Sequence, residues 1–418
     1  MRFKKVLVAA LGLCRATVII GWALIEGEGR RPLVEVSVRA KVRRRGCCGR
    51  CGVEAAFYDQ GGGRRRWRHV DVGYATCELV GPARRVDCPV HGPTVAAVSW
   101  ARHGSAFTRA FEDLVVHDAV VGNKQAAADR YGISWRAVNG MCIRVAEEAF
   151  GRVDLLHGLV AIAIDEVKYK KGHKYLTIVC DHFTGRVIWA AEGRNKAVVA
   201  RFFDALGPER SARLGFVTCD GAEWIRAVVT ERAPEAIVCI DTFHVIKWAT
   251  DAVDQVRREE WNRLRKAGGA NAAKTIKGMR WVLLRNWENL GRADKTVIRE
   301  LARANSRVFR GWQLKEELRE LFSLPLAAAR RALDDWLHYA ARSQLPAFVK
   351  LARTIRHYRA SIENTIEWRL TNGLAESVNA GIGRLRANAR GFHDPNAFIT
   401  MILLDRGGHT PNLPWAPT

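Results

Sequence analysis

The sequence predicts a multidomain protein of mixed α/β class, and three observations lead to this expectation. The chain has 418 residues, which is enough for roughly two to four domains. Short apolar segments alternate with helical ones over residues 158–245, as in the strands and helices of an α/β core. Residues 246–360 then carry Trp, Leu, Ala and Arg at spacings of three and four, which is typical of helices. We therefore expect an α/β core followed by a helical segment.

The composition indicates a folded protein with a polyanionic partner. Hydrophobic residues make up 48% of the chain and charged residues 26%, which is typical of a globular protein and excludes a disordered one. The 67 Lys and Arg outnumber the 43 Asp and Glu, for a net charge of +24. Because each phosphate neutralised by a cation releases condensed counterions, nucleic acid is the favoured partner. An anionic membrane surface and a basic protein without such a partner are the alternatives.

The N-terminal segment, residues 1–104, is expected to form a small domain and not a membrane anchor. The apolar run over 6–25 follows a basic start, as in a secretory signal, but Leu13 stands where a small residue is needed before a cysteine. Arg15 interrupts the run, which makes it a poor transmembrane helix. We expect residues 6–25 to form a buried strand and helix, and no membrane association.

Single cysteines elsewhere favour a reducing compartment. They lie in apolar surroundings and resemble small core residues. They are Cys14, Cys77, Cys142, Cys180, Cys219 and Cys239. This distribution fits a cytoplasmic protein better than a disulfide framework.

Two pairs of metal-binding residues in the N-terminal segment predict a structural zinc site. Cys48 and Cys51 form one C-x-x-C pair, and Cys88 and His91 form a second pair with the same spacing. Four such ligands suit a tetrahedral Zn²⁺ ion and leave no open position for water, so the role would be structural. Cys47 is an alternative to Cys48, although its spacing is less usual, and chance adjacency of these residues is the other alternative.

Basic residues flank the two pairs and suggest contacts with DNA phosphates. They are Arg43, Arg44, Arg45 and Arg50, followed by Arg64, Arg65, Arg66 and Arg68, which surround Trp67, a further candidate for DNA contact. A solvated charged surface is the alternative explanation.

Residues 105–150 are expected to be helical and to contain a helix-turn-helix. Asn123 can cap one helix, Gly132 permits the tight turn that follows it, and Ser134 can cap the next helix. Three side chains of the second helix would point outward, where a recognition helix meets base edges or phosphates. They are Trp135, Arg136 and Asn139. An ordinary helical hairpin is the alternative.

Acidic residues follow three apolar segments of the expected α/β core. Asp165 ends AIAID, Asp220 ends GFVTCD and Asp241 ends AIVCID. Glu376 lies on a late amphipathic helix, on the stripe that also holds Asn372 and Asn379 and opposite an apolar stripe that can pack on a sheet. Strand-end acids together with a helix acid suit two-metal phosphoryl chemistry, because Mg²⁺ and Mn²⁺ prefer oxygen ligands. Each acid taken alone is equally well explained as a solvated one.

The chain resembles transposases of the ISL-three family of bacterial insertion sequences over essentially its full length. The resemblance rests on the paired zinc knuckles, the helix-turn-helix and five further segments. These are IAIDEVKYKKGHKYLTIVCDHFTGRVIWAAEGR, VTCDGAEWI, CIDTFHVIKWATDAVDQVRRE, KGMRWVLLRNWENL and TNGLAESVNAGIGRLRANARGF. It implies a ribonuclease-H-like catalytic core over 158–245 and 361–405, an all-helical insertion over 246–360, and a tail over 406–418.

The resemblance also implies a DDE transposase. The zinc-binding and helix-turn-helix domains would bind the terminal inverted repeats of the insertion sequence. The enzyme would cleave a phosphodiester at the element end and join the freed 3′ hydroxyl to target DNA. The catalytic residues would be Asp165, Asp220 and Glu376, holding two Mg²⁺ or Mn²⁺ ions, with Asp241 as a possible alternative.

Further expectations concern phosphate contacts, assembly and location. Residues near the first acid would hold phosphates, with a solvated surface as the alternative. They are Lys168, Lys170, Lys171 and Arg194. The partners would be double-stranded DNA, both terminal repeats and target, and other copies of the chain in the DNA complex. The location would be the bacterial cytoplasm, in association with the nucleoid.

Two departures from the family pattern stand out. Gly49 and His91 occupy positions where the family usually has Pro and Cys, although His still binds zinc. The final helix has Ser377, Gly383 and Arg386 in a segment where the family usually has Gly and Lys.

Two other functions are alternatives to a DDE transposase. They are a catalytically inactive, transposase-derived DNA-binding regulator and a nuclease acting on DNA–RNA hybrids.

Overall fold

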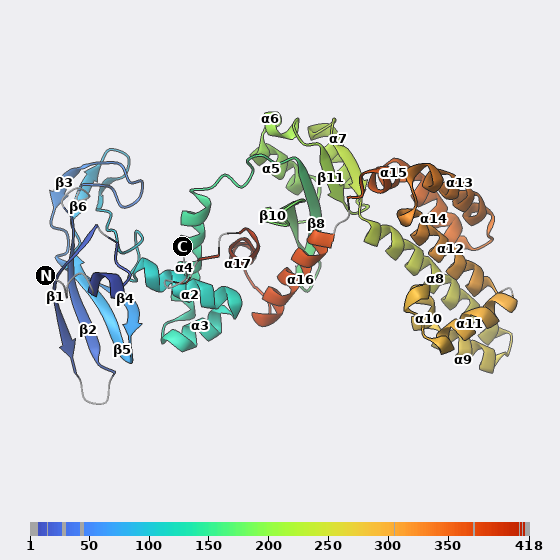
Figure 1. Ribbon diagram of the computed structural model, residues 1–418, viewed down its shortest axis with the longest axis horizontal. Helices are drawn as coiled ribbons and strands as arrows, with labels where there is room; N and C mark the ends of the chain where they lie inside the picture. Colours follow the sequence, from blue (N-terminus) through green and yellow to red (C-terminus); the bar gives the residue numbers. More distant parts are fainter. Residues whose placement is uncertain are drawn as a thin grey trace. The chain divides into compact units, whose positions relative to one another are not determined.

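The computed structural model of the protein divides into two compact units (Figure 1). The first comprises residues 1–154 and 383–418, and the second comprises 155–382. The structure describes residues 7–14, 16–26, 31–41, 46–304, 306–370, 373–408, 410, 411 and 413, with the side chain of Ala375 excepted. Arg15, Arg43, Arg44, Arg45 and Asn372, singled out above, lie outside the described residues.

The first unit contains two small sheets. The larger has the order β1-β2-β5-β4, with strands β1 (Thr17–Ile25), β2 (Leu33–Ala40), β4 (Arg64–Val72) and β5 (Ala75–Pro82). The smaller has the order β3-β6-β7, with β3 (Ala56–Asp59), β6 (Arg85–Cys88) and β7 (Gly92–Val95). The core under the larger sheet includes Val36, Val38, Leu79 and Trp100.

The strand expected within residues 6–25 is present as β1, after a helical turn at residues 7–10. The prediction that this strand is buried is correct for only part of it. Thr17 and Ile19 are buried, whereas Trp22 and Leu24 are 48% and 59% exposed. The reason is that β1 lies at the edge of its sheet.

Three helices of the first unit form the predicted helix-turn-helix: α2 (Arg109–Val121), α3 (Lys124–Tyr131) and α4 (Trp135–Phe150). The Asn123 side chain caps α3 by accepting from the Ala126 N–H at 2.8 Å, and Ser134 caps α4 by accepting from the Ala137 N–H. Gly132 has φ of 62°, a left-handed conformation that a side chain would disfavour. Helix α17 (Pro395–Arg406) adds Met401 and Leu404 to the same hydrophobic core.

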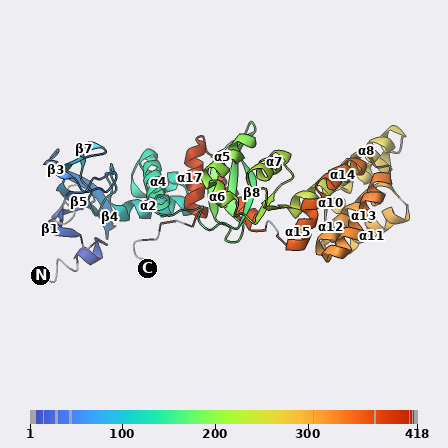
Figure 2. The same ribbon diagram turned by 90° about the horizontal axis from the view of Figure 1, so that it is seen from above.

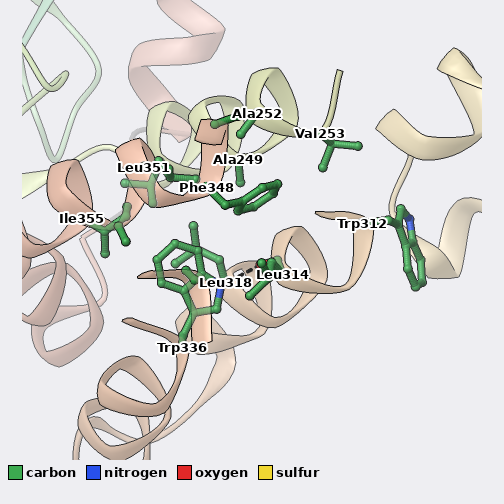
Figure 3. Packing of buried hydrophobic residues seen from close by; sticks show 14 of the residues in the cluster. Ala249, Ala252, Val253, Trp312, Leu314, Leu318, Trp336, Phe348, Leu351 and Ile355 are labelled. Carbon is green, nitrogen blue, oxygen red and sulfur yellow. Dashed lines mark hydrogen bonds between the residues drawn. The ribbon is translucent and has the colours of Figure 1, made fainter. Parts of the chain in front are cut away.

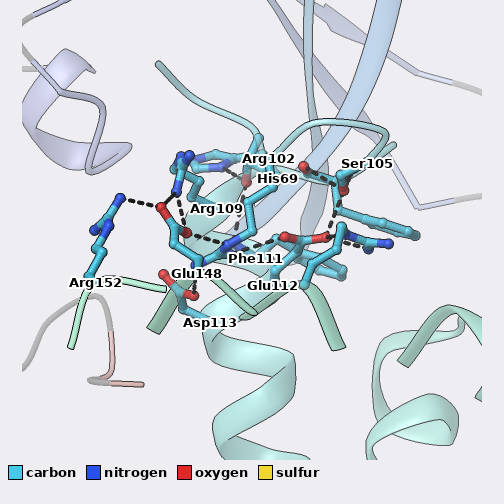
Figure 4. Close-up of polar contacts among 12 residues, drawn as sticks. His69, Arg102, Ser105, Arg109, Phe111, Glu112, Asp113, Glu148 and Arg152 are labelled. Atoms are coloured by element: carbon cyan, nitrogen blue, oxygen red, sulfur yellow. Dashed lines mark hydrogen bonds and ion pairs between the residues drawn. The ribbon is translucent and has the colours of Figure 1, made fainter. Parts of the chain in front are cut away.

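A buried ion network fixes α2 and α4 to the preceding loop (Figure 4). Glu112 is fully buried and accepts hydrogen bonds from Arg102 Nη1 at 3.0 Å, Arg144 Nε at 2.8 Å and Ser105 Oγ at 2.7 Å. Arg102 also donates to Glu148 of α4. Removing one partner would leave a buried charge uncompensated, at a cost of about 3–5 kcal/mol. The network therefore holds the helix-turn-helix in a fixed position on its own unit.

The second unit contains a five-stranded mixed sheet of order β10-β9-β8-β11-β12. The strands are β8 (Ala161–Lys170), β9 (Lys174–Asp181), β10 (Val187–Glu192), β11 (Phe216–Cys219) and β12 (Ile237–Ile240). β8, β9 and β10 pair antiparallel, while β8, β11 and β12 pair parallel. Helices α5 (Lys196–Leu206) and α7 (Glu223–Arg232) pack on it, with the short α6 (Pro208–Ser211) between them.

The apolar segments predicted to precede Asp220 and Asp241 are strands β11 and β12, and the one predicted to end at Asp165 needs a correction. β8 does not end at Asp165 but runs on to Lys170. Residues 165–170 stay in the strand because they continue the antiparallel pairing with β9, as in the pair Asp165 and Ile178.

The rest of the second unit is helical, as predicted from its spacing (Figure 2). The helices are α8 (Thr242–Lys266), α9 (Ala270–Gly278), α10 (Arg280–Leu284), α11 (Arg292–Arg303), α12 (Arg307–Glu320), α13 (Leu326–Arg342), α14 (Pro346–His357) and α15 (Arg359–Trp368). Their core packs Ala249 and Val253 of α8 against Phe348 of α14 (Figure 3). Buried Trp336 donates its Nε1–H to the Leu314 carbonyl at 2.8 Å, so its polar atom is satisfied.

Helix α16 (Gly373–Asn388) follows and lies beside β8 (Figure 1). Val378 and Ile382 of the predicted apolar stripe are buried, whereas Leu374 is 46% exposed. Among the described residues, none of the helices has the length and apolar character that spanning a bilayer demands.

Candidate active site, zinc centre and DNA-binding modules

Three acids occupy equivalent positions on three neighbouring parallel strands. Ile164 of β8, Cys219 of β11 and Ile240 of β12 are in register across the sheet. The next residues along these strands are Asp165, Asp220 and Asp241. Because neighbouring strands lie about 4.8 Å apart, the three acids meet at one edge of the sheet. The pairing register thus gathers residues that are far apart in the sequence.

Asp165 is held from two sides. Its Oδ1 accepts from the Glu166 N–H at 2.7 Å, and its Oδ2 accepts from Asn379 Nδ2 of α16 at 2.5 Å. Burial raises the pKa of the Asp165 carboxyl; the two hydrogen bonds and His244 oppose the rise, while the charge of Asp220 adds to it. The hydrogen bond from Asn379 attaches α16 to the sheet at this point.

Glu376 lies one turn before Asn379 on α16, and residues three apart share a helix face. Its side chain is exposed. Partial burial raises the pKa of Glu376, and the carboxylates of Asp241 and Asp165 raise it further. Glu376 therefore shares a face of α16 with Asn379, the residue that contacts Asp165.

Asp220 follows β11 and accepts from the Ala222 N–H at 2.9 Å. The residue between them, Gly221, is in close contact with Trp248 of α8. A Cβ on Gly221 would lie 2.1 Å from the Cζ2 atom of Trp248. The Tyr358 hydroxyl donates to the Gly221 carbonyl at 2.5 Å. Two aromatic side chains of the helical region thus hold the turn that carries Asp220.

Asp241, the alternative second acid, has its carboxylate occupied. It is 4% exposed and caps α8 by accepting from the Phe243 N–H at 3.1 Å. Its other oxygen pairs with His244 Nδ1 at 2.8 Å, and this contact raises the pKa of the histidine. The geometry therefore favours Asp220 over Asp241 as an available ligand.

Glu166 belongs to the same site, although the sequence reasoning gave it no role. It forms an ion pair with Arg194, and its Oε1 is buried without a hydrogen-bond partner among the described residues. Burial, followed by the charge of Asp220, raises the pKa of Glu166 to about 7. Its position directly after Asp165, where pairing with β11 stops, is the signal that could have identified it.

The acids outnumber the neighbouring cations. Five carboxylates lie together at this site, and Arg194 and His244 offset part of their negative charge. The five carboxylates belong to Asp165, Glu166, Asp220, Asp241 and Glu376. Oxygen ligands with uncompensated negative charge and an unpaired buried carboxylate oxygen fit a divalent cation such as Mg²⁺ or Mn²⁺.

The predicted zinc ligands come together. The ligand atoms of Cys48, Cys51, Cys88 and His91 all lie within 4.8 Å of one another. The Cys51 and Cys88 sulfurs are 3.6 Å apart, and His91 Nδ1 is 3.8 Å from the Cys48 sulfur. Ligands about 2.0–2.3 Å from a tetrahedral Zn²⁺ are roughly 3.3–3.8 Å apart, so the group fits the ion. Cys47 is not part of the group.

The arginines near the predicted zinc site have partners within the protein. The prediction that Trp67 contacts DNA is wrong, because its side chain is buried. Trp67 is 2% exposed and packs edge-on against Trp100, with ring centroids 5.5 Å apart. It is a core residue because alternate positions of β4 face inward. Arg66 pairs with Glu35 and Glu78. The other members also have partners: Arg64 with Ser37, Arg65 with the Ser105 carbonyl, and Arg68 with Asp71.

The recognition helix presents two of its three predicted side chains. Trp135 and Arg136 are exposed, whereas Asn139 is half-buried and accepts from Lys124 Nζ at 2.6 Å. Lys124 is itself 5% exposed and lines a cavity of about 400 Å³ together with Trp135 and Phe392. The side-chain oxygen of Asn139 therefore already accepts a hydrogen bond within the protein.

The predicted phosphate contacts near the first acid differ in availability. Lys168, Lys170 and Lys171 are exposed along the β8–β9 hairpin. Lys170 lies opposite Lys174, so like charges accumulate at this tip. Arg194 is instead bound to Glu166.

The chain matches three protein families over consecutive segments. Residues 44–91 match a zinc-finger of transposase IS204/IS1001/IS1096/IS1165, and residues 96–146 match the helix-turn-helix domain of transposase family ISL3. Residues 162–402 match the ISL3 family described as transposase.

Relatives match over nearly the whole chain. The transposase for insertion sequence element IS1557 of Mycobacterium tuberculosis (strain H37Rv) is 41% identical over 436 residues, covering 99% of this chain and 98% of the relative. The homologue from strain CDC 1551 / Oshkosh gives the same values. The transposase for element IS1001 of Bordetella parapertussis is 27% identical, covering 90% of this chain and 92% of the relative.

A zinc finger, a helix-turn-helix and a transposase region in one chain define a DNA-binding transposase. The matched segments and the full-length relatives show that this chain belongs to the ISL3 family of transposases.

Proposed function

We propose that the chain moves its own insertion sequence by metal-dependent cleavage and strand transfer at a DDE triad of Asp165, Asp220 and Glu376. The observation that carries this proposal is the register of the strands, which aligns Asp165 with Asp220, together with the hydrogen bond that ties α16 to Asp165. The mixed five-stranded sheet is consistent with a ribonuclease-H-like core. Helices α8–α15, which separate the second acid from Glu376, would be its helical insertion.

The triad and Glu166 would hold two divalent cations, Mg²⁺ or Mn²⁺. When bound, the two ions would neutralise charge on the attacking and leaving oxygens of an in-line displacement. Asn379 would orient one oxygen of Asp165, and Arg194 would restrain Glu166. Trp248 and Tyr358 would keep the Asp220 turn in place. Preorganised ligands of this kind cost little reorganisation when DNA arrives.

DNA recognition would fall to the first unit. The helix-turn-helix, with Trp135 and Arg136 exposed, would read the terminal inverted repeats. Zn²⁺ would be structural, because four protein ligands complete its tetrahedron. Target DNA would be the second partner, several copies of the chain would join the two ends, and the reaction would take place in the bacterial cytoplasm on the nucleoid.

A cleavage assay tests this proposal. The purified full chain would be incubated with a labelled duplex carrying the inverted repeat that flanks the gene, with Mg²⁺, with Mn²⁺ or with EDTA. Asp165→Ala, Asp220→Ala and Glu376→Ala should each abolish cleavage while binding to the repeat stays within about twofold of the wild type. Asp251→Ala, which removes an exposed acid of the same unit, is the matched control.

Repeat binding without divalent-metal cleavage by the wild type would instead identify an inactive DNA-binding regulator. Cleavage that survives Asp165→Ala would show that the site assignment is wrong.

A further inference from the structure

The helical region of the second unit has an uneven charge distribution. Residues 261–307 hold twelve Lys and Arg against three Asp and Glu, whereas residues 311–370 hold ten against seven. In the later segment some cations are neutralised by acids, as where Arg359 pairs with both Asp334 and Glu363. The excess of positive charge is therefore concentrated around the end of α8 and on the helices that follow it.

Three neighbouring helices contribute to one basic and aromatic surface. We call it the α8–α10 face and define it as Arg258, Trp261 and Arg265 of α8, Lys277 of α9, and Arg280 and Trp281 of α10. The α8 residues follow a spacing of three and four and so share one stripe of the helix. Arg265 Cζ and Lys277 Nζ lie 5.3 and 5.5 Å from the centre of the Trp261 ring, which joins α8 and α9 at this point. Arg280 lies 5.0 Å from the Trp281 ring.

The positive charge of this face is only weakly compensated. Asp254 is the acid beside it, and this one carboxylate is shared by Arg257 at 2.7 Å, Arg258 at 3.2 Å and Arg280 at 3.7 Å. Arg265 and Lys277 form no ion pair with an acid in the part of the chain that the structure describes. Mutual repulsion of such cations is unfavourable to folding, so the folded state gains nothing from their concentration here.

An exposed aromatic side chain on the α8–α10 face also indicates a binding surface. Trp281 is 66% exposed, although a large aromatic ring gains free energy when it is covered. Cations beside the half-buried Trp261 and the exposed Trp281 suit a polyanion that also offers sugar and base surfaces. The face is made of Arg, Lys and Trp, and such cations contact phosphates without reading sequence.

We propose that the α8–α10 face binds the phosphate backbone of the target duplex, independently of its sequence. The proposal rests on the proposed function, because it assigns the target-binding step of strand transfer. It adds a second DNA surface to the helix-turn-helix, and it separates the recognition of a fixed sequence from the capture of an arbitrary one.

The test compares two triple variants of the full-length protein. Arg265→Gln/Lys277→Gln/Arg280→Gln removes three cations of the face. Arg331→Gln/Lys350→Gln/Arg353→Gln removes three exposed cations of α13 and α14 and serves as the matched control. Binding to a random-sequence duplex is measured across a series of salt concentrations, and thermal unfolding is followed in parallel.

The face variant should bind the random duplex at least about tenfold more weakly, and the slope of log K against log salt should become shallower by about 2 to 3, since each lost contact accounts for about 0.9. Its unfolding midpoint should be unchanged or higher. Joining of a pre-cleaved end to an unrelated plasmid should fall by at least about tenfold, while cleavage of the terminal repeat stays within about twofold.

Wild-type affinity and slope for the face variant, or an equal loss in the control variant, would overturn the proposal. An equal loss of terminal-repeat binding would also overturn it, because the face would then serve the element end. The random-duplex measurement needs no catalysis. A wild-type protein that fails to cleave would therefore refute the proposed function while leaving this measurement decisive.

Discussion

The two candidate metal centres of this transposase are built in opposite ways. The four zinc ligands come from two C-x-x-C-like pairs, each formed within one turn, and their atoms cluster within 4.8 Å. The carboxylates come from β8, β11 and α16, and their meeting depends on the register of the sheet and on one hydrogen bond from Asn379. The first centre is therefore set by local spacing and the second by topology. The zinc centre should govern folding of its own domain, and the carboxylate centre should govern catalysis.

The largest expected effect is loss of zinc. Chelation, or Cys48→Ser, should unfold the residues around the small sheet, because structural Zn²⁺ contributes about 10 kcal/mol or more to such domains. Limited proteolysis should then cut between residues 46 and 96, and repeat binding should fall. Cys47→Ser is the control and should leave zinc content at one ion per chain. One zinc ion retained by Cys48→Ser would show that the centre is not the one described.

The opposite behaviour is expected at the carboxylate centre. Glu376→Gln should reduce cleavage by at least about a thousandfold. The unfolding midpoint should move by less than about 2 °C, since the side chain is exposed and fills no cavity. Circular dichroism and a cleavage assay on the same preparation check both points. A large drop in the midpoint would mean that Glu376 serves folding, and the contrast with zinc would be lost.

A pH effect on stability is expected in the first unit, from a histidine that is not one of the predicted zinc ligands. His69 is buried between Thr108 and the Leu11 carbonyl, and burial lowers its pKa to about 4. The unfolded state therefore binds the proton more readily than the folded state. Stability should be full above about pH 6.5 and should decrease by up to roughly 3 kcal/mol as the pH falls toward 4.

Denaturant unfolding at pH 7 and pH 5 measures this effect. His69→Gln should reduce the difference in unfolding free energy between pH 7 and pH 5. His157→Gln, at an exposed position, should leave that difference unchanged. An unchanged pH dependence in His69→Gln would assign it to other groups.

A smaller effect is expected for the hydrogen bond that ties the helix to the sheet. Asn379→Ala should lower cleavage by about 10- to 100-fold, as is usual for a residue that positions a metal ligand. The loss should be partly recovered at high Mn²⁺ concentration, because Asp165 itself remains. A merely structural role would lower stability without any dependence on the metal concentration.

The smallest effect concerns the turn that carries Asp220. Gly221→Ala should destabilise the second unit by about 1–3 kcal/mol, because the new methyl group meets the Trp248 ring. Combining it with Trp248→Phe should recover part of the loss, which a double-mutant cycle would measure. Strict additivity of the two changes would argue against direct contact.

The sequence was most informative where function depends on short spacing. The zinc ligands, the caps Asn123 and Ser134, and the strands that end before Asp220 and Asp241 all follow from residues within a few positions of one another. These features are local, so a single sequence is enough to predict them.

Other features depended on pairing and packing. The arginines next to Trp67 suggest a DNA contact, but the alternation of side chains along β4 places Trp67 in the hydrophobic core. The extension of β8 beyond Asp165 depends on pairing with β9. The contacts of Asn379 with Asp165 and of Tyr358 with Gly221 join residues more than 130 positions apart, and no local pattern reports them.

Binding of Mn²⁺ shows whether acids that are remote in the sequence share one divalent metal site. Electron paramagnetic resonance of the full-length protein with the terminal-repeat duplex, corrected with a duplex-only sample, counts the bound ions. Asp165→Ala and Glu376→Ala should each lose the Mn²⁺ that the wild type binds, whereas Asp251→Ala should keep it. Wild-type Mn²⁺ affinity and stoichiometry in Glu376→Ala would show that α16 contributes nothing to the metal site and would overturn the proposed triad.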